Sequence, residues 1–228
     1  MRNVLADLYD STNGVRSVLA SLAQESSSLA LRQEDLARHS LIHNAMPVVL
    51  SGFLETFMRD CSQRFMIGVS GRGKAFADLP AIIKKRHFEG GGRILSDVAK
   101  NRITWVTSSQ YDISVRIAEG ARNSPARPLW EAFAFTGGNP SGAVIKSFLE
   151  NLGVNSPANQ IDAMANGRRP WASLKSDLDL FISVRNECAH TGRVVSSPSN
   201  SVILDYCELI DDVCCRIIEL LESHLSSM

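Results

Sequence analysis

The sequence predicts an all-α protein. Apolar residues recur at steps of three and four positions along almost the whole chain of 228 residues, which is the period of a helix with one buried face. No stretch shows the alternation of apolar and polar residues that the strands of a large sheet require. With 44% hydrophobic residues and no net charge, the chain is too apolar and too weakly charged to be disordered. We therefore expect a single helical domain over residues 1–228.

The balance of charge limits the classes of partner. A net charge of zero is unusual for a protein that coats nucleic acid over its whole surface, so any such contact has to come from a local basic cluster. The five cysteines lack the paired spacing of a metal finger, no uncharged run approaches the roughly 20 residues of a membrane span, and the first residues contain no apolar leader. We expect a cytoplasmic protein with reduced cysteines, no metal, no cofactor and no membrane association.

Two helices are predicted in the N-terminal part of the chain. Apolar residues over 4–22 mark one face of the first, although Asn13 and Gly14 weaken its middle and favour two shorter pieces. A second, very long helical pattern extends over residues 29–66. The glycines of residues 68–73 predict a loop after it.

The middle of the chain, about residues 68–135, is expected to be a less regular insert. A short helix is predicted to begin with Asp78 as its cap and Pro80 in its first turn, and to end at the three glycines of residues 90–92. Residues 93–100 and 112–121 have helical spacing, whereas residues 103–106 favour a short strand.

The C-terminal part has clearer helix signals. Asn139 and Pro140 resemble the cap and first position of a helix that Gly153 closes, and a short helix is predicted between Ser156 and Gly167. Apolar spacing then predicts a helix over about residues 170–190, stopping near Gly192. After a polar linker, the last helix is expected over about residues 201–225.

The end of the helix over residues 170–190 carries the motif with the clearest chemical content. It reads Arg185-Asn186-Glu187-Cys188-Ala189-His190. This segment resembles the R-x(4–6)-H signature of HEPN domains (higher eukaryote and prokaryote nucleotide-binding), in the form R-N-x-x-A-H. Residues 50–60, and the run from Thr136 to Pro140 with the apolar residues after it, also resemble stand-alone prokaryotic HEPN proteins of about this length.

The resemblance implies a HEPN-like antiparallel helical bundle, with additional helices and loops in the middle of the chain, that acts as a metal-independent endoribonuclease. In that reaction the ribose 2′-hydroxyl attacks the adjacent phosphorus and leaves a 2′,3′-cyclic phosphate and a 5′-hydroxyl. His190 is the candidate acid/base, because an imidazole exchanges a proton near neutral pH. Arg185 is the candidate ligand of the phosphate oxygens, because a guanidinium donates two parallel hydrogen bonds. Asn186 is expected to orient the substrate or the histidine.

The spacing of the motif adds a geometric constraint. A separation of five residues is about 140° around a helix, so Arg185 and His190 lie on different faces of a straight helix. They converge only if the helix unwinds at its end or if two copies of the motif meet. The resemblance implies the second arrangement, a homodimer with a composite active site.

The resemblance also implies a prokaryotic defence or toxin setting, with an antitoxin or a defence-complex protein as a candidate partner. Toxin-type relatives that are paired with nucleotidyltransferase antitoxins often carry a tyrosine two positions after the histidine. Gly192 stands at that position here. Control by AMP attachment at this site is therefore not expected, which also weakens the antitoxin assignment.

Other charged side chains are candidates for supporting roles. Glu55 and Arg59, one helical turn apart, either pair with each other or support the motif from a neighbouring helix. Two basic clusters are candidates for binding RNA: Lys84, Lys85, Arg86 and Arg93 on a loop of the insert, and Arg168 and Arg169 before a Pro–Trp pair. The plainer interpretation of the first cluster is a solvated helix end, and that of the second is the start of a core helix.

Two alternatives to the enzyme remain open. The chain could be a non-catalytic HEPN module that binds RNA, a nucleotide or a protein partner, or a structural subunit of a defence complex. In either case His190 would cap the end of its helix, where a cation is favoured, and Arg185 would pair with Asp179 or Glu187.

Overall fold

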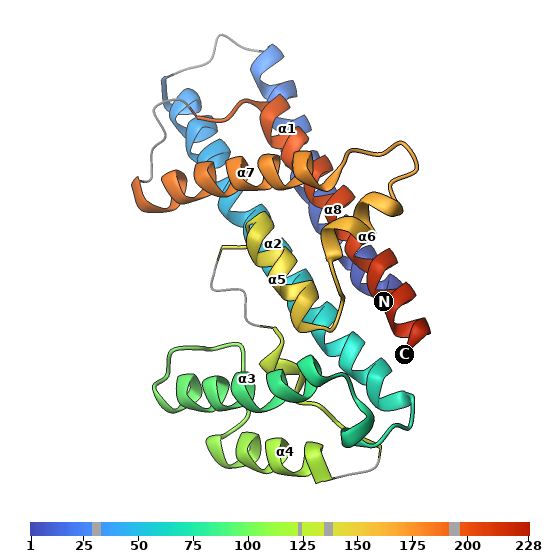
Figure 1. The fold of residues 1–228 in the computed structure, drawn as a ribbon. Coiled ribbons are helices and arrows are strands. Elements are labelled where there is room, and N and C mark those ends of the chain that lie inside the picture. Colours follow the sequence, from blue (N-terminus) through green and yellow to red (C-terminus); the bar gives the residue numbers. More distant parts are fainter. Residues whose placement is uncertain (29–32, 123–124, 135–138, 192–196) are drawn as a thin grey trace.

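The computed structural model describes residues 1–28, 33–122, 125–134, 139–191 and 197–228, and within these ranges it contains helices and no strand (Figure 1). The all-α prediction is therefore confirmed. The α-helices are α1 (Arg2–Ser28), α2 (Gln33–Gly71), α3 (Ala81–Ala99), α4 (Gln110–Arg122), α5 (Gly142–Asn151), α6 (Pro157–Ala163), α7 (Trp171–Thr191) and α8 (Asn200–Ser227). Two single-turn 3-10 helices are η1 (Phe76–Asp78) and η2 (Trp130–Ala132).

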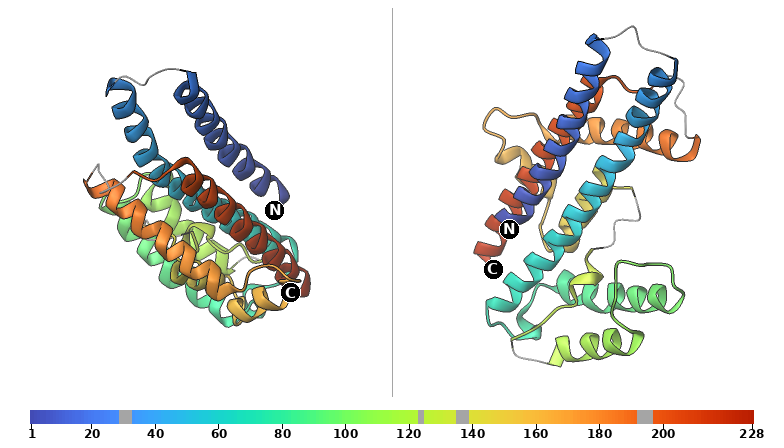
Figure 2. Two further views of the ribbon diagram at one scale, coloured as in Figure 1. Left: turned by 90° about the horizontal axis from the view of Figure 1, so that it is seen from above. Right: turned by 180° about the vertical axis from the view of Figure 1, so that it is seen from behind.

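The long helix α2 lies at the centre of the molecule and packs against α1, α7 and α8. α1 runs antiparallel to α2 and α8, and α7 crosses α2 at a steep angle (Figures 1 and 2). Leu50, Leu54 and Phe65 of α2 are completely enclosed. Burying one such side chain contributes about 1.5–3 kcal/mol, so the apolar stripe of each helix is what holds the bundle together.

α2 is also the single helix of the described chain that is long and apolar enough to span a membrane. Its apolar side is occupied by α1, α7 and α8, which is the environment of a core helix. Sequence reasoning expected α2 to end before Gly68, but the helix continues to Gly71. Gly68 lies inside the helix next to α8, where a Cβ atom would stand 2.5 Å from Leu225 Cδ2.

The insert contains the largest departures from the sequence predictions. Asp78 lies in η1, α3 begins after Pro80, and α3 continues through the three glycines that were expected to end it. A Cβ atom on Gly90 would stand 2.4 Å from the carbonyl oxygen of Ala132, and one on Gly91 would stand 2.9 Å from Ile117. These glycines let η2 and α4 approach α3, which is information that the local pattern does not contain.

Four further differences concern local structure. Residues 103–106 form an irregular segment and no strand, and α1 is one continuous helix despite Asn13 and Gly14. Asn139 does not cap α5; the cap is Ser141, whose hydroxyl accepts a hydrogen bond from Val144 N. The short helix α6 ends at Ala163, before Gly167, which adopts a positive φ of 85° in the following turn. The residues from Thr136 to Gly138, and Gly192, lie outside the described ranges.

Candidate active site

α7 carries the Arg–Asn–His motif and is fixed to its neighbours on one face. Its side chains Trp171, Leu174, Leu178 and Phe181 are buried against the bundle at steps of three and four residues. Asp179, halfway along, accepts a hydrogen bond from Gly142 N at 3.1 Å and pairs with Lys175 at 2.7 Å. The polar residues of the motif thus project from a helix whose position is set by packing.

Arg185 is half-buried and is held by two side-chain amides. Its Nη1 donates to Asn186 Oδ1 at 3.1 Å and to Asn139 Oδ1 at 3.3 Å, and the latter residue precedes α5. Its buried Nε has no hydrogen-bond partner among the described residues. Within those residues Arg185 also makes no ion pair with a carboxylate, and the proposed partner Asp179 is occupied elsewhere. The amides orient the guanidinium without neutralising its charge, which leaves it able to bind an anion.

Glu55 and Arg59 face this region from α2. Glu55 lies within electrostatic range of both Arg185 and Arg59. Burial raises the pKa of the half-buried Glu55 carboxyl group, and the two arginines oppose that shift. Arg59 in turn donates to Thr56 Oγ1 at 2.9 Å. Of the two predicted supporting residues, Glu55 thus interacts electrostatically with the arginine of the motif, while the direct contacts of Arg59 are with Thr56 and Trp105.

His190 lies apart from this cluster. α7 is helical without interruption to Thr191, so Arg185 and His190 stand about 140° apart around the axis. The His190 side chain is exposed and makes no hydrogen bond or ion pair with any residue of the described chain. Unwinding of the helix end, one of the two ways to bring the two side chains together, does not occur.

The first basic cluster lies on α3 and not on a loop. Lys84 Nζ donates to the carbonyl of Ala77 at 2.7 Å, Lys85 lies 3.9 Å from Glu89, and Arg93 lies 3.8 Å from Asp97. Arg86 is half-buried; its Nε donates to Ala132 O at 3.0 Å, and burial lowers the pKa of its guanidinium. The other three side chains of the cluster reach solvent, whereas Arg86 has a structural role in joining α3 to η2.

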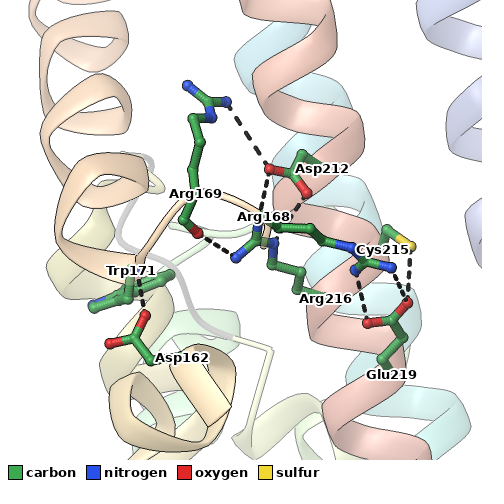
Figure 3. A network of polar contacts seen from close by, with 8 residues as sticks. All are labelled: Asp162, Arg168, Arg169, Trp171, Asp212, Cys215, Arg216 and Glu219. Atoms are coloured by element: carbon green, nitrogen blue, oxygen red, sulfur yellow. Dashed lines mark hydrogen bonds and ion pairs between the residues drawn. The ribbon is translucent and has the colours of Figure 1, made fainter. Parts of the chain in front are cut away.

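The second basic cluster belongs to a network that joins the turn before α7 to α8 (Figure 3). Arg168 makes a two-pronged contact with Glu219 at 3.0 and 3.1 Å, and Arg169 lies 2.7 Å from Asp177. The buried Arg216 binds Asp212 and donates to the carbonyl of Arg169 at 2.6 Å. Trp171, which begins α7 directly after this turn, and Arg185 are 14 residues apart, or about 21 Å along the helix. The structure does not bring this cluster to the motif.

A cavity of about 470 Å³ lies between α7 and α8, and its lining contains none of the motif residues Arg185, Asn186 and His190. Its lining includes Asp177, Asp205 and Glu208 together with apolar side chains and Arg169. An excess of carboxylates repels phosphate groups, so this cavity is a poor candidate for a nucleic-acid site. The polar contacts around Arg185 remain the better one.

Sequence reasoning missed Asn139 as a member of the site. Its place before Pro140 is typical of a helix cap, and the contact with Arg185 spans 46 residues of chain. The resemblance of the segment from Thr136 to Pro140 to HEPN proteins was the one sequence signal that marked it. Trp105, which contacts Arg59, lies in the least regular segment and carried no signal.

Comparison with known proteins supports the family resemblance. The family model described as RiboL-PSP-HEPN matches residues 13–223, which include every residue of the site. Searches of curated proteins and of solved structures returned no significant match.

Proposed function

The chain belongs to the RiboL-PSP-HEPN family, and from this premise we propose that it is a metal-independent endoribonuclease. The observation that carries the proposal is the environment of Arg185, whose guanidinium is held by the neutral amides of Asn139 and Asn186 with one buried N–H unused by the described residues. A cation oriented in advance, and not neutralised by direct contact, suits the charge that develops on the non-bridging phosphate oxygens. Glu55 supports the arginine at longer range.

In the proposed reaction the 2′-hydroxyl of RNA attacks the neighbouring phosphorus, and the 5′-oxygen of the next nucleotide leaves. A base removes the proton of the hydroxyl, and an acid protonates the leaving oxygen. The imidazole of His190 is exposed at the end of α7 and is therefore accessible to a substrate. It serves as the acid/base, while Arg185 binds the phosphate.

The separation of Arg185 and His190 supports a site shared between two chains. Because α7 does not unwind, the two side chains of one chain face different directions. A homodimer in which the motifs meet places the His190 of one chain opposite the Arg185 of the other. The cellular setting proposed is the prokaryotic cytoplasm, in a defence or toxin system, with an antitoxin or a defence-complex protein as regulator.

The same separation favours a second candidate function. A chain that acts alone holds an anion-binding arginine without a histidine beside it, which suits a non-catalytic module that binds RNA, a nucleotide or a protein partner. Binding without cleavage is the property that distinguishes the two candidates.

The test is incubation of the purified protein with single-stranded RNA, and with DNA of the same sequence, in excess chelator. We expect cleavage of RNA alone, because DNA lacks the attacking hydroxyl. Arg185→Ala and His190→Ala should each lower the rate by at least about a hundredfold, the lower end of what one acid/base or one charge-stabilising group contributes. Cleavage of DNA, or loss of cleavage on chelation, would contradict the mechanism. RNA binding without cleavage would favour the second candidate.

A further inference from the structure

We propose that Arg59 and Trp105 form a stacking subsite for one unpaired nucleobase of the RNA, beside the phosphate that Arg185 binds. This inference rests on the proposed function, since it names a contact with the same substrate. It concerns a residue of the irregular segment between α3 and α4 that neither the family match nor the motif assigns.

The contact between the two side chains is of the type that binds nucleobases. The guanidinium carbon of Arg59 lies over the Trp105 ring at 5.7 Å from its centroid. Trp130 lies on a neighbouring segment with its ring centroid 5.9 Å from that of Trp105 and its plane tilted by 42°. All three side chains are only partly buried. A planar cation and an indole that both reach solvent offer surfaces on which any base can stack, whatever its sequence.

The pair is connected to the motif through Glu55. This carboxylate interacts electrostatically with Arg59 and with Arg185, so both guanidiniums lie near one side chain of α2. Glu55 and Arg59 are one helical turn apart on α2, so a nucleotide whose phosphate binds Arg185 has the Arg59–Trp105 pair on the neighbouring helix as its candidate base contact. The site thus extends from α7 across α2 to the insert.

The backbone at the end of α3 explains how Trp105 reaches α2. Asn101 adopts a left-handed conformation with φ of 52°, Asn101 N donates to Val98 O, and Arg102 N donates to Asp97 O at 2.8 Å. These bonds make a Schellman turn, which ends α3 and reverses the chain. Lys100 and Arg102 on this turn are exposed, and neither side chain makes an ion pair or hydrogen bond with a described residue. They supply positive charge for the phosphates that follow the stacked base.

The experiment measures binding of a single-stranded RNA oligomer to the full-length His190→Ala protein, which isolates affinity from cleavage. Trp105→Leu in this background is expected to weaken binding by at least about fivefold, the lower end of the loss seen when a stacking aromatic is removed. Trp105→Phe, which keeps an aromatic ring, should lose less affinity for the RNA than Trp105→Leu. Tyr111→Leu is the matched control, because Tyr111 is an exposed aromatic on α4 outside the proposed subsite. A circular dichroism melt of each variant checks folding.

A second arm changes the RNA and leaves the protein intact, so that it decides the question even if Trp105→Leu does not fold. Oligomers with one abasic nucleotide at each position in turn should show one position at which loss of the base weakens binding to the His190→Ala protein. In the Trp105→Leu variant, the abasic nucleotide at that position should cause no further loss of affinity. Equal affinities of Trp105→Leu and its parent, or an abasic series without a sensitive position, would overturn the subsite.

Assay of the protein with intact His190 separates the two proposals. If RNA is cleaved while stacking is absent, the subsite is wrong and the ribonuclease stands. If the stacked position is found while no RNA is cleaved, the ribonuclease is wrong and the subsite stands as part of an RNA-binding module.

Discussion

At the scale of single residues, the site depends on how one arginine is held. An ion pair between Arg185 and a carboxylate at contact distance would have to be broken before a phosphate could bind. Here the direct contacts are with the amide oxygens of Asn139 and Asn186, and Glu55 acts from further away. Surface ion pairs of Arg168 and Arg169 are the opposite case, since their charges are already used. A positive charge alone therefore does not mark a candidate phosphate site. Arg185 differs from Arg168 and Arg169 because its direct partners are amides and theirs are carboxylates.

Asn139→Ala tests this interpretation of Arg185. Removal of one hydrogen bond to a charged group costs about 1.5–3 kcal/mol, and at 3.3 Å we expect the lower end, a loss of about tenfold in kcat/KM for RNA. Asn159→Ala is the matched control, because Asn159 is exposed on α6. Steady-state kinetics on both variants is the measurement. An Asn139→Ala protein with wild-type kcat/KM would show that this contact does not orient the arginine.

The residue scale also shows what the sequence could reveal about the site. Arg185, Asn186 and His190 were recognisable because they form a contiguous motif on one helix. Glu55 and Arg59 could be named only as candidates, since nothing in a helical spacing says which other helix they face. Asn139 was interpreted as a helix cap, because Asn before Pro is typical of one, while the actual cap is Ser141 two residues later.

At the scale of the helices, the apolar spacing placed α1, α2, α7 and α8 along the chain, with ends displaced by a few residues. Two of the misplaced helix ends lie at glycines. In a local pattern a glycine predicts the end of a helix, but Gly68 and Gly90 lie inside α2 and α3, where Leu225 and Ala132 occupy the space of a side chain. Contacts of this kind depend on tertiary packing, so a local pattern cannot show them.

Two neighbouring glycines of α3 provide a matched test. Gly90→Ala places a Cβ atom 2.4 Å from the backbone of Ala132, which cannot move easily, so we expect a loss of about 1–3 kcal/mol in the free energy of unfolding. Gly92 has no neighbour within 4 Å, and Gly92→Ala should gain about 0.5–1 kcal/mol through higher helix propensity. Urea denaturation measures both. A stabilising Gly90→Ala would refute the close packing of α3 on η2.

His87 makes the packing of the insert dependent on pH. Its Nδ1 accepts from Leu129 N at 3.0 Å, so its Nε2 carries the hydrogen and donates to Ile117 O at 2.8 Å. Burial lowers the pKa of this imidazole below its ordinary value. The unfolded chain therefore binds the proton more tightly, and the contribution of His87 to stability is complete above about pH 6.5 and is lost as the pH falls below it.

Amide hydrogen exchange can measure the pH-dependent contribution of His87 to the stability of the insert, helix by helix. Between pH 7.5 and 5.5, after correction for intrinsic rates, amides of α3 and α4 should lose more protection than amides of α1. Such a local comparison is necessary because burial also lowers the pKa of His43 and His224. An equal loss of protection in α1, α3 and α4 would contradict the role assigned to His87.

At the scale of the whole molecule, the sequence predicted the helical fold and the family, and both are confirmed. It could not predict the position of the insert, because the approach of Trp105 to Arg59 depends on a turn at Asn101 and on packing against α2. The sequence also suggests how two chains assemble, through the spacing of Arg185 and His190. One chain presents an oriented arginine on one face of α7 and an exposed histidine on another, so the proposed cleavage reaction calls for a second chain.

The measurement that tests this account most directly is subunit exchange between two inactive variants. Arg185→Ala and His190→Ala homodimers should each cleave RNA at about one hundredth of the wild-type rate or less. When the two are mixed and allowed to exchange, part of the activity should return, because one pairing in the heterodimer contains an intact Arg185 and an intact His190. Stably folded, dimeric variants that recover no cleavage would contradict the shared site, and a fully active His190→Ala homodimer would contradict the ribonuclease mechanism itself.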